Sequence, residues 1–146
     1  MCSSDLCHIY DLFTFLTGAP VKSVHATAVS PSTNYYAASD NFVATVSFED
    51  GSVATLTYTA LGNTEFSKES MEVFVDGMVI SLDDYRRLTV TGNRQKPMET
   101  RAACKGQKEE LQAFAAAIRG EAEWPIPLWQ QVQATRISFD VDRFLA

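Results

Sequence analysis

The chain has 146 residues and a mass of 16.1 kDa; 46% of its residues are hydrophobic, and its formal net charge is −6. This length suits one domain, over residues 1–146, with an ordinary core. The 12 basic residues are scattered and outnumbered by 18 acidic ones, so we expect no nucleic-acid partner, which would require a concentrated positive field. No stretch is long and apolar enough to predict a membrane span. Three cysteines without a Cys-x-x-Cys pair favour a reducing compartment, so we expect a cytoplasmic protein.

The first half of the sequence predicts one helix and then a sheet. The helix ends at Gly18, and its apolar residues recur at helical spacing: Leu6, Ile9, Phe13 and Leu16. Alternation and β-branched residues predict three strands, with a hairpin between the second and third: residues 21–30, 41–48 and 53–61. Asp76-Gly77 predicts the tight turn of a second hairpin, formed by residues 71–75 and 78–82. Residues 87–91 are expected to form one more short strand.

The last third of the sequence predicts two helices. The first spans residues from about 105 to 119 and stops at Gly120. The second runs from residue 128 to about 144, and its large apolar residues are expected to be buried: Leu128, Val132 and Phe139. The order of elements therefore predicts an α+β fold, in which an open, mostly antiparallel β-sheet carries helices on one face.

The predicted central strands carry little charge. Lys22 is the single Lys, Arg, Asp or Glu in the three runs, and hydroxyl residues alternate with the bulky apolar ones: Thr27, Thr45, Ser47, Thr55, Thr57 and Thr59, with Ser30 nearby. A sheet face open to water usually carries charged residues, so we expect this face to pack against another surface. The alternative is a small solvated face that reflects only the strand preference of threonine.

The densest polar cluster lies in the first predicted helix. Asp5 and Asp11 flank His8 at spacings of three, which places both carboxylates one helical turn from the imidazole. A carboxylate beside a histidine fixes its tautomer and raises its basicity, which suits proton transfer. The alternative is a surface or capping histidine. His25, in the middle of a predicted strand, is interpreted as structural, and two histidines are too few to predict a structural zinc site.

Several motifs occur in one order along nearly the whole chain. They are Cys7-His8-Ile9-Tyr10-Asp11-Leu12, residues 41–48 followed by Asp50-Gly51-Ser52, residues 58–62, Lys68-Glu69, residues 72–74, Asp83-Asp84-Tyr85-Arg86-Arg87-Leu88, residues 108–111 and Pro125-Ile126-Pro127. Together they resemble the C-terminal domain of the glucose–fructose oxidoreductase/inositol dehydrogenase (Gfo/Idh/MocA) family. That family joins a Rossmann domain, which binds NAD(P), to a C-terminal α+β domain whose open sheets pack face to face in dimers.

The resemblance implies a role for the first helix and leaves out a cofactor site. His8 matches the family histidine that positions a substrate hydroxyl and relays its proton, and Asp5 and Asp11 are the accompanying candidates for substrate binding. The sequence lacks the Gly-rich turn and the Glu-Lys-Pro loop of the nucleotide-binding half, and Ser4 stands where many members have an aspartate. We therefore expect no cofactor and no metal in this chain, with NAD or NADP implied only for a full-length relative.

Two functions follow from the resemblance. The first is a stand-alone substrate-binding and dimerisation module, not catalytic by itself, that forms a homodimer through its sheet face. The alternative is a component or fragment of an NAD(P)-dependent oxidoreductase acting on a sugar-like or polyol substrate, with a separate Rossmann-domain chain as partner. A third reading, a fragment that folds without a function, also stays open.

Overall fold

The computed structural model of the protein describes residues 6–30 and 32–145. The chain divides into two compact units: Met1–Leu61 with Ile126–Ala146, and Gly62–Pro125. The elements of the first unit are α1 (Cys7–Thr17), β1 (Val21–Ala28), the short 3-10 helix η2 (Ala38–Asp40), β2 (Asn41–Phe48), β3 (Val53–Thr59) and α3 (Leu128–Leu145). Those of the second unit are β4 (Ser70–Val75), β5 (Met78–Asp83), β6 (Arg87–Thr91), β7 (Met98–Glu99) and α2 (Gln107–Ile118).

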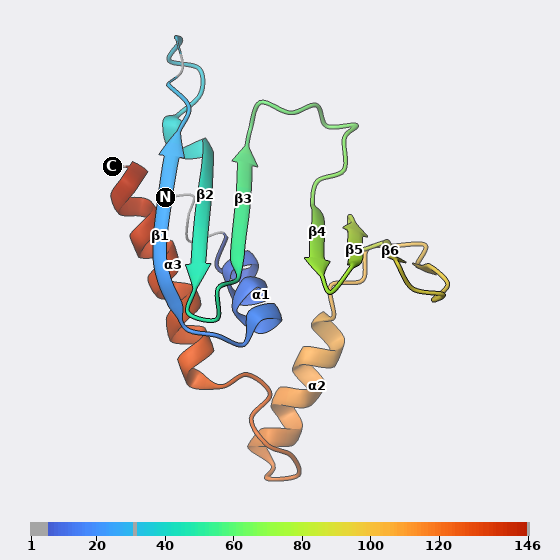
Figure 1. The fold of residues 1–146 in the computed structure, drawn as a ribbon. Coiled ribbons are helices and arrows are strands. Elements are labelled where there is room, and N and C mark those ends of the chain that lie inside the picture. Colours follow the sequence, from blue (N-terminus) through green and yellow to red (C-terminus); the bar gives the residue numbers. More distant parts are fainter. Residues whose placement is uncertain (1–5, 31, 146) are drawn as a thin grey trace. The chain divides into compact units, whose positions relative to one another are not determined.

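The first unit contains an antiparallel sheet of three strands in the order β1-β2-β3. Side chains alternate between its faces, so that Ala26, Ala44 and Leu56 stand opposite one another on one face. Both α1 and α3 cover this face (Figure 1). The hairpin predicted between the second and third strands is confirmed, with residues 49–52 as its turn.

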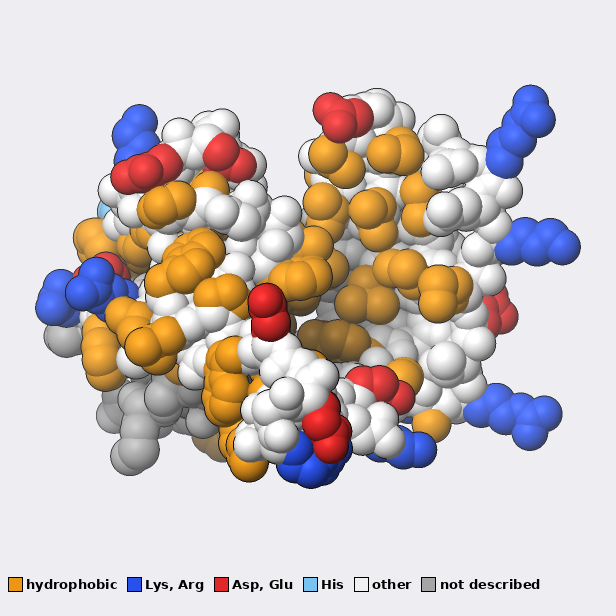
Figure 2. All heavy atoms as spheres, turned by 90° about the horizontal axis from the view of Figure 1, so that it is seen from below, with side chains coloured by type: hydrophobic (Ala, Val, Ile, Leu, Met, Phe, Trp, Pro, Cys, Tyr) orange, Lys and Arg blue, Asp and Glu red, His pale blue; other side chains and the backbone are white. Residues whose placement is uncertain are grey.

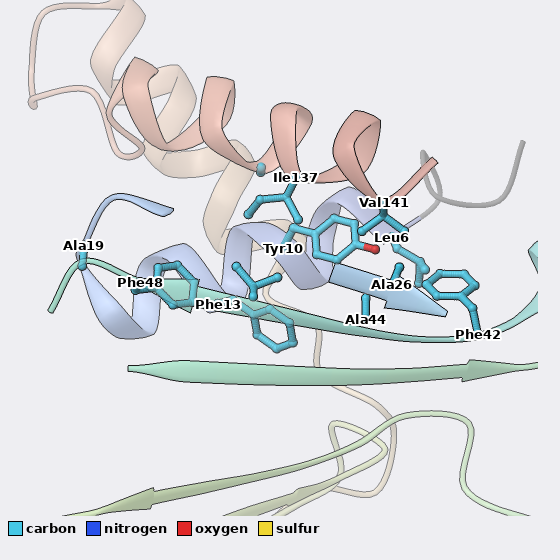
Figure 3. Close-up of a cluster of buried hydrophobic side chains, with 12 residues drawn as sticks. Leu6, Tyr10, Phe13, Ala19, Ala26, Phe42, Ala44, Phe48, Ile137 and Val141 are labelled. Carbon is cyan, nitrogen blue, oxygen red and sulfur yellow. The ribbon is translucent and has the colours of Figure 1, made fainter. Parts of the chain in front are cut away.

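The core of the first unit lies between this sheet and the two helices. Figure 3 shows its side chains converging from all of these elements: Leu6, Tyr10, Phe13, Ala19, Ala26, Phe42, Ala44, Val46, Phe48, Ala134, Ile137 and Val141. Four consecutive inward positions of β2 are at most 1% exposed, which makes β2 the central strand in burial as well as in order. This cluster fixes where α1, and with it His8, lies on the sheet.

The buried faces of two helices differ from those predicted by side-chain size. On α1, Tyr10, Phe13 and Thr14 are buried, whereas Leu16 is 45% exposed. On α3, the predicted Leu128, Val132 and Phe139 are all exposed, and the buried residues are Ala134, Ile137, Ser138 and Val141. Small residues at 134 and 138 allow the backbone of α3 to approach its neighbours closely, which a face of large side chains would prevent.

The second unit contains a separate antiparallel sheet in the order β4-β5-β6-β7. The predicted Asp76-Gly77 turn is confirmed: both residues have positive φ, 48° and 77°, and Val75 pairs with Met78. Gly92, which follows β6, also has a positive φ of 90°, and a Cβ atom there would lie 2.7 Å from the carbonyl oxygen of Gly77. A glycine at this position therefore allows the ends of two neighbouring turns to come together.

The α+β class and the open antiparallel arrangement are confirmed, but the described strands form two sheets where we expected one. Residues 60–69 separate β3 from β4, and these two strands do not pair in the described part of the chain. Two short elements were not predicted: the 3-10 helix η2 and the two-residue strand β7. None of the helices among residues 6–30 and 32–145 combines the length and apolar character that crossing a bilayer requires.

Candidate functional site

The predicted polar cluster begins at the N-terminal end of α1. His8 is the second residue of the helix and is exposed, and Asp11 follows one turn later and is half-buried. Asp5 lies outside the described residues. The structure therefore places His8 and Asp11 on one helix at the spacing we predicted, and their roles in substrate binding or proton transfer stay predictions.

The residue between the two polar candidates anchors the helix. Tyr10 is fully buried, and its hydroxyl has no hydrogen-bond partner among the described residues. Burial, followed by the negative charge of Asp142 and the thiol of Cys7, raises the pKa of Tyr10 well above its ordinary value. The phenol is therefore neutral at physiological pH, and its ring packs edge-on against Phe13 with 6.4 Å between centroids (Figure 3).

A second anchor joins α3 to both α1 and β1. The side-chain amide of Gln133 donates to the hydroxyl of Thr14 at 3.2 Å and to the carbonyl of Ala19 at 3.1 Å. Its oxygen accepts a hydrogen bond from the backbone N–H of Val21 at 2.9 Å. One amide thus satisfies three polar groups where α1 ends and β1 begins, which fixes the tilt of α1 on the sheet.

The hydroxyl residues predicted to share one face of the sheet do so. Register places Thr27, Thr45, Ser47, Thr55, Thr57 and Thr59, with Val43 and Val53, on the face opposite the core; we call this set the hydroxyl face. Ser30 lies just beyond the end of β1. Within the described first unit, this face is uncovered: Val53 is 63% exposed, and only Thr45 and Ser47 are half-buried.

A buried amide organises one end of the same sheet. Asn41 is 2% exposed, donates from Nδ2 to the carbonyl of Ala37 and accepts at Oδ1 from the hydroxyl of Thr59 and the N–H of Ala60. It therefore fastens the connection that precedes β2 to the end of β3. Sequence reasoning missed this residue, because its partners are 4, 18 and 19 positions away and no local motif marks them.

The second unit contains a charged cluster that sequence reasoning also missed. The ammonium of Lys105 lies 2.5 Å from Oε1 of Glu69 and 4.8 Å from the centre of the Tyr85 ring. Burial and the neighbouring Glu69 carboxylate raise the pKa of Tyr85, and Glu69 also raises that of Lys105. Asp84 and Tyr85 both have positive φ, so this cluster supports a strained turn between β5 and β6.

The hollows and apolar surfaces lie elsewhere. A shallow hollow of about 410 Å³ on the first unit is lined by Ser23, Val24, Asp140, Arg143 and Phe144, and thus contains neither His8 nor Asp11. Figure 2 shows apolar side chains at the surface of the protein. Large apolar residues that are exposed include Phe15, Phe74, Leu111 and Leu128. Among the described residues, no three His, Cys, Asp or Glu side chains are grouped as metal ligands would be.

Comparison with known proteins shows the family to which this fold belongs. The family model described as the GFO/IDH/MocA C-terminal domain matches residues 5–81, which is more than half of the chain. The chain belongs to this family. The match includes α1 with His8 and Asp11, the whole first sheet, β4 and the first part of β5.

Solved structures of Gfo/Idh/MocA oxidoreductases share the fold over nearly the whole chain. The UDP-N-acetylglucosamine 3-dehydrogenase GnnA from Acidithiobacillus ferrooxidans matches 97% of this chain at a TM-score of 0.71 and 21% identity. The WlbA dehydrogenase from Bordetella pertussis, in complex with NADH and UDP-GlcNAcA, matches 97% at 0.57 and 18%. An NAD-binding protein from Listeria innocua matches 94% at 0.57 and 16%.

This chain spans less than half of those proteins. It covers 47% of the Acidithiobacillus chain, 41% of the Bordetella chain and 47% of the Listeria chain. At these identities, the likeness shows the fold alone. No curated protein matches the sequence.

Proposed function

We propose that this chain is a stand-alone substrate-binding and dimerisation module derived from an NAD(P)-dependent oxidoreductase, and that it is not catalytic by itself. The observation that carries the assignment to a C-terminal module is the extent of the match. The family model describes a C-terminal domain, and 94–97% of this chain corresponds to less than half of each of the three oxidoreductase-family structures.

The backbone arrangement does not fit a dinucleotide site. A dinucleotide-binding unit needs parallel strands with a helical crossover and a Gly-rich turn at a helix N-terminus. Every strand pairing in the described residues is antiparallel, and the sequence contains no Gly-x-Gly-x-x-Gly. We therefore assign no residue of this chain to NAD(P) and derive no hydride-transfer step from it.

The hydroxyl face supports the dimerisation part of the proposal. Threonine and serine hydroxyls can form hydrogen bonds across an interface, and burying them avoids the cost of several kcal/mol that an unpaired charge would add. Hydroxyl residues occur on all three strands of this face. A twofold axis would pack the face against the same face of a second copy, so that hydroxyls meet hydroxyls.

His8 and Asp11 carry the substrate-binding part of the proposal. The relatives named above include a UDP-N-acetylglucosamine 3-dehydrogenase and a dehydrogenase in complex with NADH and UDP-GlcNAcA. A sugar or polyol hydroxyl would accept or donate a hydrogen bond at the exposed imidazole of His8, and the Asp11 carboxylate one turn later would orient that ring. Asp5, three residues before His8 in the sequence, is the third candidate for substrate binding.

Titration calorimetry of the chain with NADH and NADPH tests the proposal. We expect no measurable heat of binding up to millimolar cofactor, because no described element offers a pyrophosphate site. A micromolar dissociation constant for either cofactor would contradict the proposal, because it would show a cofactor site in this chain.

The partial coverage of the relatives supports a second function: a component of an oxidoreductase whose Rossmann domain is supplied elsewhere. Affinity purification of the chain from its own cells distinguishes the two. A co-purifying protein with a Gly-x-Gly-x-x-Gly turn would favour the component. Recovery of no protein other than this chain, with a polypeptide mass of 16.1 kDa, would favour the stand-alone module.

A further inference from the structure

The side of the sheet that carries the hydroxyl face also carries a histidine. Register places His25 opposite Thr45 and on the same side of β1 as Thr27. His25 is exposed, so its imidazole lies at the surface that the proposed dimer would cover. Histidine is the side chain that ordinarily gains a proton as pH falls from 8 to 5. A charge that depends on pH therefore lies on this surface.

The ring of His25 packs against the last helix. Its centroid lies 5.0 Å from that of Phe144, with 67° between the ring planes. Figure 1 shows the C-terminal part of α3 beside β1, which is the edge strand of the sheet, so Phe144 meets His25 at that edge. This edge-to-face contact favours one orientation of the imidazole. The ring therefore has a set place on the sheet.

The charged residues of α3 near this edge interact with other groups. Asp140 and Arg143 line a hollow together with Phe144, and Nη1 of Arg143 lies 2.8 Å from Oδ1 of Asp140. Asp142 acts on buried Tyr10, where burial and then this negative charge raise the pKa of the phenol. What α3 presents to His25 is therefore the ring of Phe144.

The strands beside His25 contribute groups whose charge is constant over this pH range. On this side of the sheet, β2 and β3 carry valines, threonines, a serine and, at one end, Asn41. Lys22, near the start of β1, lies at the shift of register between Val21 and Ser23, and a lysine stays protonated from pH 8 to pH 5. Among the described residues of this side, His25 is therefore the one whose charge changes in that range.

We propose that protonation of His25 is a pH switch that separates the dimer formed through the hydroxyl face. The inference rests on the proposed function, because it names the regulation of that same interface. Each copy brings one imidazole to the covered side, and burying a cation among hydroxyl and apolar groups is unfavourable without a partner of opposite charge. Each copy must therefore release its proton to water before it associates, so the dimer is stable at neutral pH and is lost as pH falls.

Sedimentation equilibrium at about pH 7.5 and about pH 5.5, on either side of the usual titration range of histidine, tests the switch. For the unaltered chain, we expect the dissociation constant of the dimer to rise about 100-fold at the lower pH, because the two copies each take up a proton. His25→Gln and His25→Phe cannot ionise, so this constant should change less than about threefold in both. His25→Phe also keeps an aromatic ring against Phe144. His25→Lys, which is charged at both pH values, should be monomeric at both.

His8→Gln is the matched control, because His8 is the only other histidine of the sequence and lies on α1, which covers the opposite face of the sheet. Its dimer should weaken at the lower pH as that of the unaltered chain does. Three results would overturn the switch and leave dimerisation standing: an unaltered dimer equally stable at both pH values, a pH dependence that persists in both neutral variants, or one that disappears in His8→Gln. A monomer at the higher pH would overturn the dimerisation part of the proposed function, and the switch with it.

Discussion

At the scale of single residues, two polar side chains fasten the first unit: half-buried Gln133 joins α3 to α1 and β1, and buried Asn41 joins the start of β2 to the end of β3. Asn41 and Gln133 each satisfy three partners, and these bonds tie segments that are far apart in the sequence. Tyr10 is the opposite case, because its hydroxyl is buried without a partner among the described residues. Its ring contributes to the core, while its hydroxyl carries a desolvation cost that no bond offsets.

Replacing Tyr10 by phenylalanine tests this division. Because the ring stays and only the unpartnered hydroxyl is lost, Tyr10→Phe is expected to leave the free energy of unfolding unchanged or to raise it by up to about 1 kcal/mol. Tyr10→Leu, which removes ring volume, should lower it by about 2–4 kcal/mol. Urea denaturation followed by circular dichroism measures both. A loss above about 1 kcal/mol in Tyr10→Phe would show that the hydroxyl has a partner.

The turn between β2 and β3 gives a pH dependence at a single residue. The Asp50 carboxylate accepts a hydrogen bond from the backbone N–H of Ser52 at 2.9 Å and another from its hydroxyl at 2.8 Å, which lower the pKa of Asp50 below 3.8. The carboxylate therefore stabilises the turn at pH values above about 4, and this contribution is lost as pH falls through the lowered pKa.

NMR titration of the Asp50 carboxyl carbon, with amide exchange at Ser52, checks this expectation. The carboxyl should titrate below its ordinary value, and protection of the Ser52 amide should fall over the same pH range. In Asp50→Asn, the protection should no longer depend on pH in this range. An ordinary pKa for Asp50 would contradict the hydrogen bonds described.

At the scale of elements, two glycines with the same backbone angle have different surroundings. Gly51 and Gly92 both have φ of 90°, but a Cβ atom meets nothing within 4 Å at Gly51, whereas at Gly92 it lies 2.7 Å from a backbone oxygen. Alanine at either position incurs the strain of positive φ, about 1–2 kcal/mol. Only at Gly92 must the neighbouring backbone also move.

The pair of alanine substitutions measures that difference. Gly92→Ala is expected to lower protection against hydrogen exchange across β5 and β6, because the displaced oxygen belongs to Gly77, which directly precedes β5, and Gly92 directly follows β6. Gly51→Ala should affect only the residues of its own turn. Equal and local effects in the two variants would contradict the close approach of Gly92 to Gly77.

Elements with a strong local signal were predictable, and faces set by distant partners were not. Alternation along residues 41–48 predicted the inward and outward positions of β2. The pair Asp76-Gly77 predicted the tight turn between β4 and β5. The prediction of which face of α3 is buried was wrong. Ala134 and Ser138 are buried because they are small enough for the helix to approach its neighbours closely, and such residues do not form a hydrophobic pattern in the sequence. For the candidate site, the spacing of His8 and Asp11 was predictable, whereas the Asn41 and Lys105 contacts link segments that no local pattern relates.

At the scale of the whole molecule, the two units differ in how much they bury. Every buried residue of the described chain belongs to the first unit, and α2 of the second unit has no buried residue. A protein that buries little apolar surface by itself gains stability when a partner covers the apolar surface that it leaves exposed. The first unit leaves one face of its sheet exposed, which agrees with the proposed role in assembly. This hydroxyl face is the surface at which that role can be tested.

Sedimentation equilibrium of the unaltered chain and of Thr57→Lys tests the assembly claim most directly. Thr57 lies on the hydroxyl face, so a lysine there would bring two like charges near a twofold axis or one charge against an apolar side chain. We predict a dimer for the unaltered chain at micromolar concentration, a monomer for Thr57→Lys and an unaffected dimer for Thr64→Lys, an exposed position on the other unit. A monomer at high micromolar concentration, or a dimer that Thr57→Lys leaves intact, would contradict the account.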